Sequence, residues 1–357
     1  MKTKMLISIL MMFTLFSVLT ASEHGMYIQV FKDVQGSPED ILTKLEETIS
    51  GTEFTILNSM DVPTPNIVRE KPETHSKFKA KLIILSNDYY TEMLTSFDQK
   101  YLVAGFFRIG LFQTQSGTQI VIADPETINR IICNDAEDAK YTEIIEKTIP
   151  FKTELISLLH TTELSEKTET ALEPIRSDKF LKKGKKDMPM MVGKMTFFQN
   201  DKQFPIIYTK ENSTVEAVKT ELISNLTKFN PEESDIDYQW TKSPEDLEWD
   251  VVGEISSADG NATLLGIMRG RTSALSFHIA GMKRETEENT TPGIDHVCAY
   301  PIEVLIMQEG ENVIVRSQRE MFRMDMYFWD AGKWAFMKFM NMPKNLDKSV
   351  KKALINE

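Results

Sequence analysis

The chain has 357 residues, a formal net charge of −12 and a hydrophobic fraction of 41%. This length suits two domains of ordinary size, and the apolar fraction is enough for packed cores. A chain this acidic is repelled by nucleic acid and by anionic membrane faces, which argues against both as partners. With only Cys133 and Cys298 it is not a disulfide scaffold. One bridge is possible in an oxidising compartment, but we expect two unpaired, half-buried thiols.

The first residues have the pattern of a secretory signal peptide. Lys2 and Lys4 precede the apolar run Met5–Leu19, and small residues follow at 20–22. The run is short of the roughly 20 apolar residues of a spanning helix, so an uncleaved anchor is the second interpretation. We therefore expect residues 1–21 to be removed. The mature protein is then periplasmic or secreted, with no stable membrane insertion.

The segment 25–160 is predicted to be a first domain of alternating strands and helices. Ser37 has the features of an N-cap, with Pro38 at the first helical position and Asp40 at the acidic position of a capping box. Apolar alternation predicts the strands, and apolar residues at helical spacing predict the helices. The strands are expected at 26–31, 54–57, 80–85, 107–113 and 118–123, and the helices between 37 and 51, at 89–97 and from 124 onward.

The segment 161–189 is predicted to be a charged, solvated linker. Its basic run Lys179–Lys186 has an alternative interpretation as an anion or membrane-surface contact, but the run is short in an acidic chain. The segment 190–357 then repeats the order of elements as a second domain, in which Ser213 and Glu216 predict the start of the first helix. Strands are expected at 204–208, 238–240, 249–255 and 263–268, followed by a short helix at 273–279, a hairpin within 300–315 and a C-terminal helical region.

An internal repeat supports this division. The segment 107–122 aligns with 300–315, with apolar residues on apolar residues and Gly117 on Gly310. Upstream, a helical pattern opened by Ser follows a short apolar run in both segments. Helices mixed with local hairpins predict an α+β fold rather than a parallel α/β sheet. We therefore expect two similar domains that arose by internal duplication.

Short segments of both halves resemble the bacterial "domain of unknown function 302" (DUF302) family. The resemblance lies in Lys81–Tyr90, Gly105–Phe112 and Ile120–Glu126 of the first half, and in Leu264–Met268 and Pro301–Ile306 of the second. That family has a strand, a short Asn-containing turn and helix, then a hairpin that runs into an acidic-Pro helix start. The resemblance implies that each domain is an antiparallel sheet with helices on one face. It also implies that two copies can pair within one chain.

The family's Cys-Asn-Pro turn corresponds to the turn around Asn87 in the first half and to the turn around Arg269 in the second. By this resemblance, Asn87 is a candidate ligand-binding residue. The family has no settled activity, so no reaction is implied.

The sequence has no signature of catalysis. It lacks a Gly-x-Ser-x-Gly elbow, a phosphate-binding loop, a His-Glu-x-x-His helix and a Cys-x-x-Cys pair. We therefore expect no catalytic residue and no cofactor. Arg108, Arg269 and Arg271 are candidates for binding an anionic ligand, because their neighbours place them at sheet ends. His278 and His296 are candidates that can converge near the second hairpin; the alternative is a half-buried ring with one hydrogen bond.

Two features suggest copper binding. Cleavage after residue 21 would put His24 third in the mature chain, where a free amine, backbone nitrogens and imidazole suit copper(II). The chain also has 20 Met, whose thioethers suit copper(I). However, Met is a common gap-filler in cores. The Met- and aromatic-rich region 321–342 is accordingly expected to be core, with an apolar ligand groove as the alternative.

Together these patterns predict an exported, non-enzymatic protein that binds a small ligand or a protein partner in the groove between its two domains. A copper-handling protein, or an enzyme of unidentified class, is the alternative.

Overall fold

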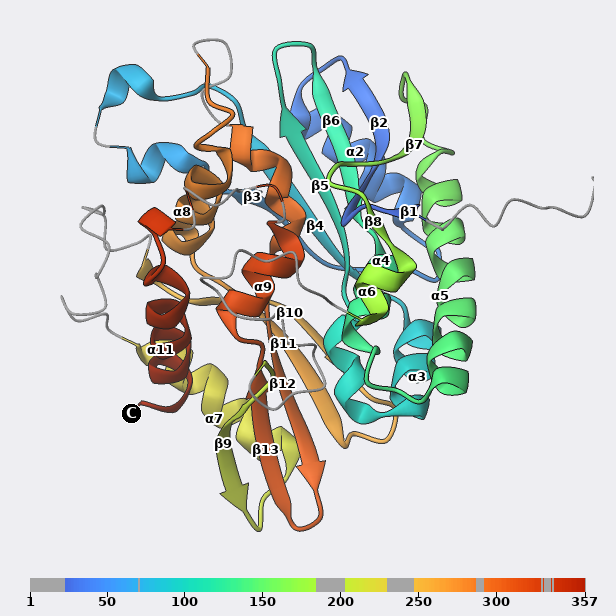
Figure 1. Cartoon of the computed structure of the whole chain (residues 1–357), viewed down its shortest axis with the longest axis vertical. Helices are drawn as coiled ribbons and strands as arrows, with labels where there is room; N and C mark the ends of the chain where they lie inside the picture. Colours follow the sequence, from blue (N-terminus) through green and yellow to red (C-terminus); the bar gives the residue numbers. More distant parts are fainter. Residues whose placement is uncertain are drawn as a thin grey trace, which may run out of the picture.

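The computed structural model describes residues 23–69, 71–183, 203–229, 247–286, 292–328, 330, 335 and 337–356. The expected signal segment 1–21 and the strand expected at 238–240 lie outside these residues. Among the helices within them, none combines the length and the apolarity needed to cross a bilayer. The fold is α+β, with antiparallel sheets and helices packed against them (Figure 1).

The first half forms a six-stranded antiparallel sheet in the order β3-β4-β5-β6-β2-β7 (Figure 1). Its strands are β2 (Tyr27–Val34), β3 (Thr55–Val62), β4 (Ala80–Ser86), β5 (Phe107–Gln113), β6 (Thr118–Ala123) and β7 (Lys167–Ala171). Its helices are α2 (Pro38–Ile49), α3 (Asp88–Phe97), α4 (Pro125–Ile132) and α5 (Asp138–Leu159), with the 3-10 helices η1 (Pro65–Val68), η2 (Pro72–Thr74) and η3 (Gln99–Ala104).

Local sequence signals explain the helix starts of this half. The Ser37 hydroxyl accepts a hydrogen bond from the backbone N–H of Asp40, as predicted. Asp124 caps α4 in the same way, through the backbone N–H of Glu126. Asn87 caps α3 by accepting from the backbone N–H of Tyr90. The cap uses the Oδ1 of Asn87, while its buried Nδ2 has no hydrogen-bond partner among the described residues.

The segment predicted to be a solvated linker contains regular structure. Residues 167–171 form β7, which pairs with β2 at the edge of the first sheet. Further on, β8 (Arg176–Ser177) pairs with β1 (Glu23–His24), and α6 (Asp178–Lys183) follows. The charged residues that suggested a linker suit an edge strand, because charged side chains discourage the unpaired backbone edge from pairing with another chain.

The second half forms a five-stranded antiparallel sheet in the order β10-β11-β12-β13-β9. Its strands are β9 (Ile206–Glu211), β10 (Asp250–Ser256), β11 (Ala262–Met268), β12 (Ile302–Glu309) and β13 (Asn312–Ser317). Its helices are α7 (Val215–Lys228), α8 (Gly270–Gly281), α9 (Glu320–Tyr327), α11 (Met342–Ile355) and the 3-10 helix η6 (Pro292–Ala299). The N-cap of α7 is Thr214, whose hydroxyl accepts from Ala217, so the prediction of Ser213 was off by one residue.

The two sheets share the order of five strands and a bulge at the same place in one strand pair. Read in chain order, each half runs through one strand, a helix, two strands, a helix and a hairpin. A bulge interrupts β3 between Ile56 and Asn58, and β10 has one between Val251 and Gly253. The β2–β6 pair has two further register shifts, between Gln29 and Phe31 and between Phe31 and Val34, whereas the β13–β9 pair has one, between Val315 and Arg316. Bulges are specific local features, so the recurrence of the first one makes the likeness more than a shared strand order.

Strand pairing also defines which residues are equivalent. Ile84, the fifth residue of β4, pairs with Arg108, and Gly266, the fifth residue of β11, pairs with Glu303. Arg108 and Glu303 therefore occupy equivalent places in the two sheets. The sequence alignment of 107–122 with 300–315 had instead placed Arg108 on Pro301, two residues before Glu303. Side chains alternate with a period of two, so a shift of two residues leaves the apolar pattern unchanged.

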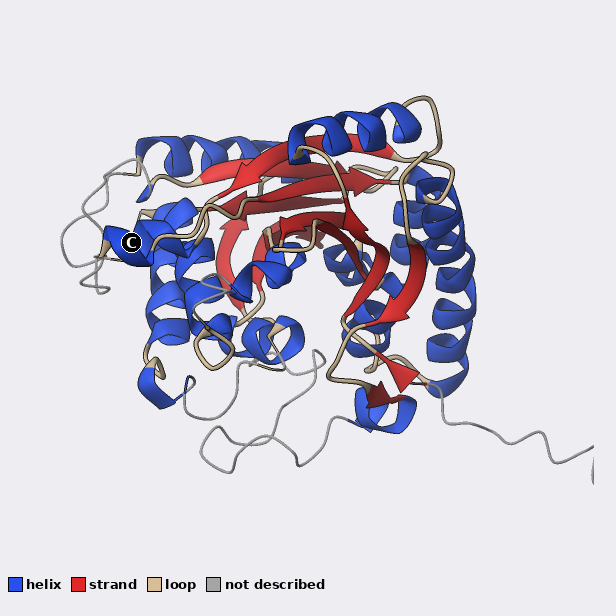
Figure 2. Ribbon diagram, turned by 90° about the horizontal axis from the view of Figure 1, so that it is seen from above, coloured by secondary structure: helices blue, strands red, loops and turns tan. Residues whose placement is uncertain are grey.

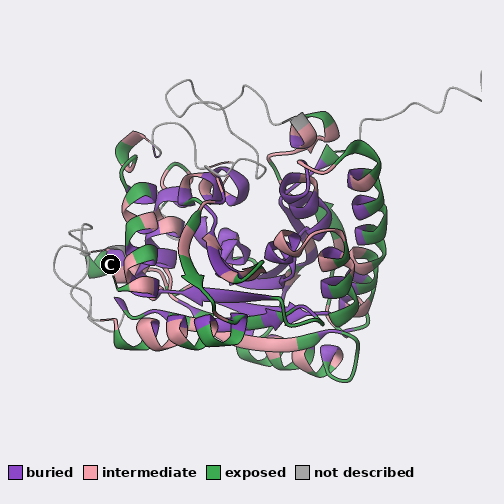
Figure 3. Cartoon of the chain, turned by 90° about the horizontal axis from the view of Figure 1, so that it is seen from below, coloured by how far each residue is buried: buried purple, intermediate pink, exposed green. Residues whose placement is uncertain are grey.

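Each half packs a short 3-10 helix against the sheet of the other half. In the first half η3 contacts β11 and β12, and in the second half η6 contacts β4, β5 and β6. Seen from above, the strands form an arch with helices on its outside and further helices within it (Figure 2). Buried residues gather on the strands and inside the arch, while the outer helices carry the exposed ones (Figure 3).

The resemblance predicted helices on only one face of each sheet, and the other face of the first sheet is covered by the second half. Phe107 packs against Tyr90 of α3, with ring centroids 4.6 Å apart. Gly110 points the opposite way, since side chains alternate along a strand. A Cβ there would lie 2.2 Å from Cγ1 of Val297 in η6. Cys298 lies on the same face, fully buried, and both cysteines are unpaired.

Candidate functional site

A polar pocket lies where the two halves and the connecting segment meet. Its cavity volume is about 220 Å³. Tyr27 comes from the start of β2, and Glu173 from the segment after β7. The second half contributes Arg284, His296 and Tyr327, from the turn after α8, from η6 and from the end of α9. The remaining lining residues are Met26, Leu172, Pro174, Asp295 and Asp330.

His296 is held between two carboxylates in this pocket. Its Nδ1 lies 2.8 Å from Oδ1 of Asp295, and its Nε2 lies 2.7 Å from Oδ1 of Asp330. Both terminal nitrogens of Arg284 donate hydrogen bonds to the carboxylate of Asp295, at 2.6 and 3.0 Å. Both ring nitrogens of His296 are thus engaged, and the ring cannot turn without losing an ion pair.

The charges of this group are mutually supporting. Burial alone would lower the pKa of His296, but Asp295 and Asp330 outweigh it and raise the pKa to about 9. Burial alone would raise the pKa of Asp295, but His296 and Arg284 bring it far below its usual range. Burial alone would also raise the pKa of Asp330, but its hydrogen bond to His296 lowers that pKa below the usual value. At neutral pH the group is therefore an imidazolium and a guanidinium facing two carboxylates.

Aromatic rings fix the plane of the His296 imidazolium. It stacks on Phe328 with centroids 5.1 Å apart and planes 19° apart. The edge of Tyr27 meets it at 5.8 Å. The aromatic contacts and the two carboxylates hold the ring in one orientation.

A buried ion network joins the pocket to the interior. The Tyr27 hydroxyl donates to the backbone oxygen of Tyr327 at 2.8 Å. The Tyr327 hydroxyl accepts from Arg108 at 2.5 Å and donates to Glu303 at 3.2 Å. Glu303 forms ion pairs with both Arg108 and Arg323, and all three side chains are at most 2% exposed. Arg108, predicted to bind a ligand, thus has its charge neutralised by protein groups.

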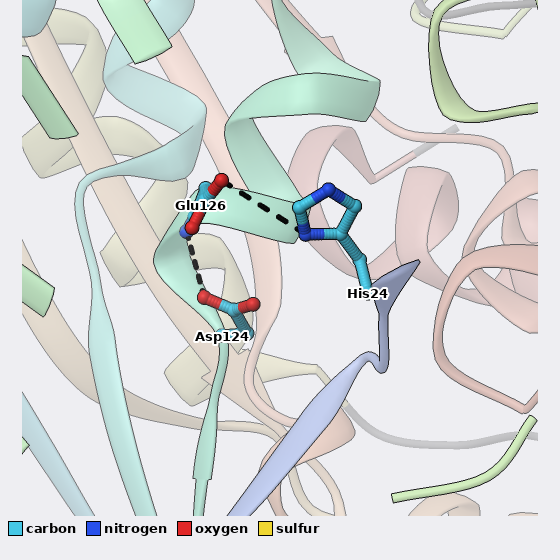
Figure 4. A group of neighbouring side chains, drawn as sticks. All are labelled: His24, Asp124 and Glu126. Atoms are coloured by element: carbon cyan, nitrogen blue, oxygen red, sulfur yellow. Dashed lines mark hydrogen bonds and ion pairs between the residues drawn. The ribbon is translucent and has the colours of Figure 1, made fainter. Parts of the chain in front are cut away.

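A second group surrounds His24 at the start of α4. The ring lies beside Glu126 and Asp124 (Figure 4). Its Nε2 is 2.6 Å from Asp178, and its Nδ1 is 3.9 Å from Glu126. Lys152 pairs with both Asp124 and Glu126, at 3.4 and 2.9 Å. These contacts describe an ion cluster at a helix N-terminus. The predicted copper motif also needs residue 22, which lies outside the described residues, so it stays a prediction.

The structure places the other predicted residues away from the pocket lining. Arg269 lies over the Trp249 ring at 4.7 Å and donates to Ser349 at 3.1 Å. Arg271 is fully buried in α8. His278 meets the edge of Phe339 at 6.4 Å. Burial, followed by Arg69 and Lys338, lowers the pKa of His278 to about 4. Of the two predicted histidines, only His296 lines the pocket.

Sequence reasoning missed Tyr27, Arg284 and Asp330. The adjacent pair of Asp295 and His296 was the only local signal. Asp330 lies 34 residues beyond His296, and the Tyr27 strand belongs to the other half. No spacing rule connects such positions, because the packing of the halves brings them together.

Comparisons with known proteins show no family for this chain. No protein-family model matches the chain, and no curated protein matches it. Among solved structures, the crystal structure of an uncharacterized conserved DUF302 protein from Bacillus stearothermophilus is similar to part of the chain. The identity is 14% and the TM-score is 0.31, over 39% of this chain and 98% of that protein.

Proposed function

We propose that this chain is an exported binding protein built from two DUF302-like copies, which takes a small ligand in the pocket at their junction. The shared strand order and the shared bulge support the duplication. The observation that carries the binding proposal is that both halves and the connecting segment line one polar pocket around His296.

The ligand class follows from size and charge. A volume of about 220 Å³ is below the roughly 300 to 1,000 Å³ of sites for drug-sized ligands, so the ligand is small. Three carboxylates face two cationic groups among the lining residues, which leaves an excess negative charge. Two tyrosine rings complete the wall. Arg108 and Arg323 already lie over the Tyr327 ring, at 5.2 Å each, so the Tyr27 ring is the one left to attract a cation. A small organic amine fits this combination.

Binding is favoured over acid–base catalysis. A general base needs a free acceptor nitrogen at working pH. Both nitrogens of His296 bond to carboxylates, and its pKa of about 9 keeps the ring protonated at neutral pH. The pocket is therefore suited to hold charge in place rather than to move a proton.

The test is calorimetric titration of the mature chain with ethanolamine, choline and methylammonium near neutral pH. At least one amine is expected to bind saturably. Asp330→Asn is expected to weaken that binding by about tenfold or more, roughly 1.4 kcal/mol. Glu169→Gln, which changes an exposed carboxylate of β7, serves as the matched control and should leave the affinity unchanged. Absence of saturable amine binding would reject the ligand class.

Divalent metal binding is a second candidate. Asp295, His296 and Asp330 each offer one atom within 4.8 Å of the others. One imidazole nitrogen and carboxylate oxygens suit borderline metals such as Zn²⁺. Titration with Zn²⁺ and Cu²⁺ tests it: saturable binding of one ion, abolished by His296→Gln and retained by His75→Gln, would favour the metal over the amine. The same Cu²⁺ titration tests the copper alternative. Saturable Cu²⁺ binding that is abolished by His24→Gln would support it, and Cu²⁺ binding that is unchanged in this variant would reject it.

A further inference from the structure

The short helices η3 and η6 each carry a ring that bonds to a carboxylate further along the chain. Tyr101 and His296 both lie three residues before the last residue of their helix. The Tyr101 hydroxyl donates to Oδ1 of Asp135 at 2.9 Å. Nε2 of His296 donates to Oδ1 of Asp330 at 2.7 Å. In both cases ring and carboxylate are 34 residues apart, so the two arrangements correspond.

A constant offset along the chain supports this correspondence. Arg108 and Glu303, which strand pairing makes equivalent, are 195 residues apart, as are Tyr101 and His296. The start of β12 lies 195 residues after the start of β5, and both ends of α9 lie 195 residues after those of α4. The equivalence of the two positions therefore does not depend on the alignment of a single residue.

In the first half the arrangement holds a helix in place and is electrically neutral. Lys100 forms an ion pair with Asp135, and its Nζ lies 5.1 Å from the centroid of the Tyr101 ring. Burial, followed by Asp135, raises the pKa of Tyr101, so the hydroxyl stays protonated. One ammonium thus balances one carboxylate, and the bonded helix η3 packs on the sheet of the other half.

The second half keeps the carboxylate and exchanges both other groups. Asp295 takes the place of Lys100, which reverses the sign of the charge there. Two carboxylates, from Asp295 and Asp330, now face the single positive charge of His296. The other charged lining residues, Arg284 and Glu173, are of opposite sign, so the excess negative charge of the junction pocket originates in this exchange.

We infer that Asp295 and His296 are the specificity-determining residues of the junction pocket. The inference rests on the proposed duplication and on the proposed amine binding. The Asp–His pair holds η6 as the Lys–Tyr pair holds η3, and it also provides the negative charge that attracts a cation. A lysine in place of Asp295 would repel a cationic ligand, because like charges brought together in an interface are costly.

The experiment transfers the first-half pair to the second half. Asp295→Lys combined with His296→Tyr, here called the graft, reproduces the neutral arrangement and keeps Asp330 as the acceptor. Two carboxylates then face two cations in the lining. The probe is whichever of ethanolamine, choline and methylammonium binds the wild-type chain. Calorimetric titration of the graft should give an affinity at least about tenfold lower, with a cooperative urea transition retained.

Two further variants keep this test decisive. Asp295→Asn keeps the shape and removes the charge, so it should also weaken amine binding and covers a graft that does not fold. The reverse graft, Lys100→Asp with Tyr101→His, should leave the affinity unchanged, since neither residue lines the junction pocket. Wild-type affinity in Asp295→Asn or in a folded graft would overturn the inference. Absence of amine binding in the wild-type chain would instead reject the proposed function, and this inference with it.

The reverse graft also tests the equivalence of the two positions without any ligand. Its imidazole would face Asp98, Asp135 and the introduced carboxylate, with the thiol of Cys133 nearby. Carboxylates outweigh burial at His296 and raise its pKa, and the same is expected here. Such a group stabilises the fold at low pH and loses that contribution as pH rises. Between about pH 6 and pH 9.5 the reverse graft should therefore lose more stability than wild type, and the graft less. Equal losses in urea unfolding for all three proteins would mean that the positions are not equivalent.

Discussion

Arg108 and Glu303 occupy equivalent places in the two sheets and form a buried ion pair with each other. If the two halves are copies, as proposed, equivalent residues that touch would lie beside the axis that relates the copies. In a symmetric homodimer the same residue would meet its own copy at such an axis. Two buried like charges there would be very costly, whereas Arg against Glu is compensated. Under the proposed duplication, joining the copies in one chain is what permits this asymmetry.

Removal of one partner of that pair is expected to be strongly destabilising. Arg108→Met leaves the carboxylate of Glu303 with Arg323 and Tyr327 but without its cross-half partner. Loss of one partner of a buried pair typically costs about 3–5 kcal/mol. Urea unfolding measures this cost. Lys147→Met, at a surface pair with Glu143, is the control, and its effect should stay under about 1 kcal/mol. Similar losses for both variants would contradict the prediction.

The pH dependence of stability should report His296. Its folded pKa of about 9 exceeds the ordinary 6.5, so its contribution is fully present below pH 6.5 and is lost as pH rises through about 9. The shift corresponds to roughly 3 kcal/mol at most. His296→Gln should remove this loss between about pH 6 and pH 9.5. Glu320 titrates in the same direction, so the difference between the two proteins is the quantity to measure.

His75→Gln is the matched control for this measurement, because His75 is exposed and its ring bonds to the backbone oxygen of Arg69. It should keep the wild-type pH profile. A wild-type profile in His296→Gln as well would mean that His296 is not charged in the folded protein.

Features that depend on neighbouring residues were predictable from the sequence. The hairpin strands at 107–113 and 118–123 match the structure because alternating apolar residues need no distant partner to be recognised. The same holds for the cap at Ser37. Repeated apolar patterns also predicted two similar halves, and the two sheets do share their strand order. These patterns could not fix the register of Arg108 against Glu303, because a two-residue shift leaves the pattern unchanged.

Features that depend on packing were only partly predictable. His296 was singled out for its place near the hairpin, and it does line the junction pocket. Its partner Asp330 and the ring of Tyr27 come from segments that meet only in the folded chain. Arg108 was predicted to bind a ligand because no local sequence pattern shows that Glu303, 195 residues away, is its ion-pair partner.

The first turn of α7 offers a test of a corrected prediction. Thr214 provides the capping hydroxyl, 3.3 Å from the backbone nitrogen of Ala217, whereas the hydroxyl of Ser213 does not cap the helix. Thr214→Ala should therefore cost about 1 kcal/mol, and Ser213→Ala much less. Thermal unfolding of the two variants, side by side, decides between the positions. A larger loss for Ser213→Ala would restore the original prediction.

The contact between the halves at Gly110 can be tested with a cavity in the opposing helix. A Cβ at this position would lie 2.2 Å from Cγ1 of Val297 and 2.7 Å from Sγ of Cys298, so Gly110→Ala should destabilise the protein by roughly 1–3 kcal/mol. Val297→Ala removes the closest of these atoms. The double variant should therefore lose less stability than the sum of the two single variants. Urea unfolding of the four proteins gives the coupling directly. Strict additivity would mean that β5 and η6 do not pack against each other at this point.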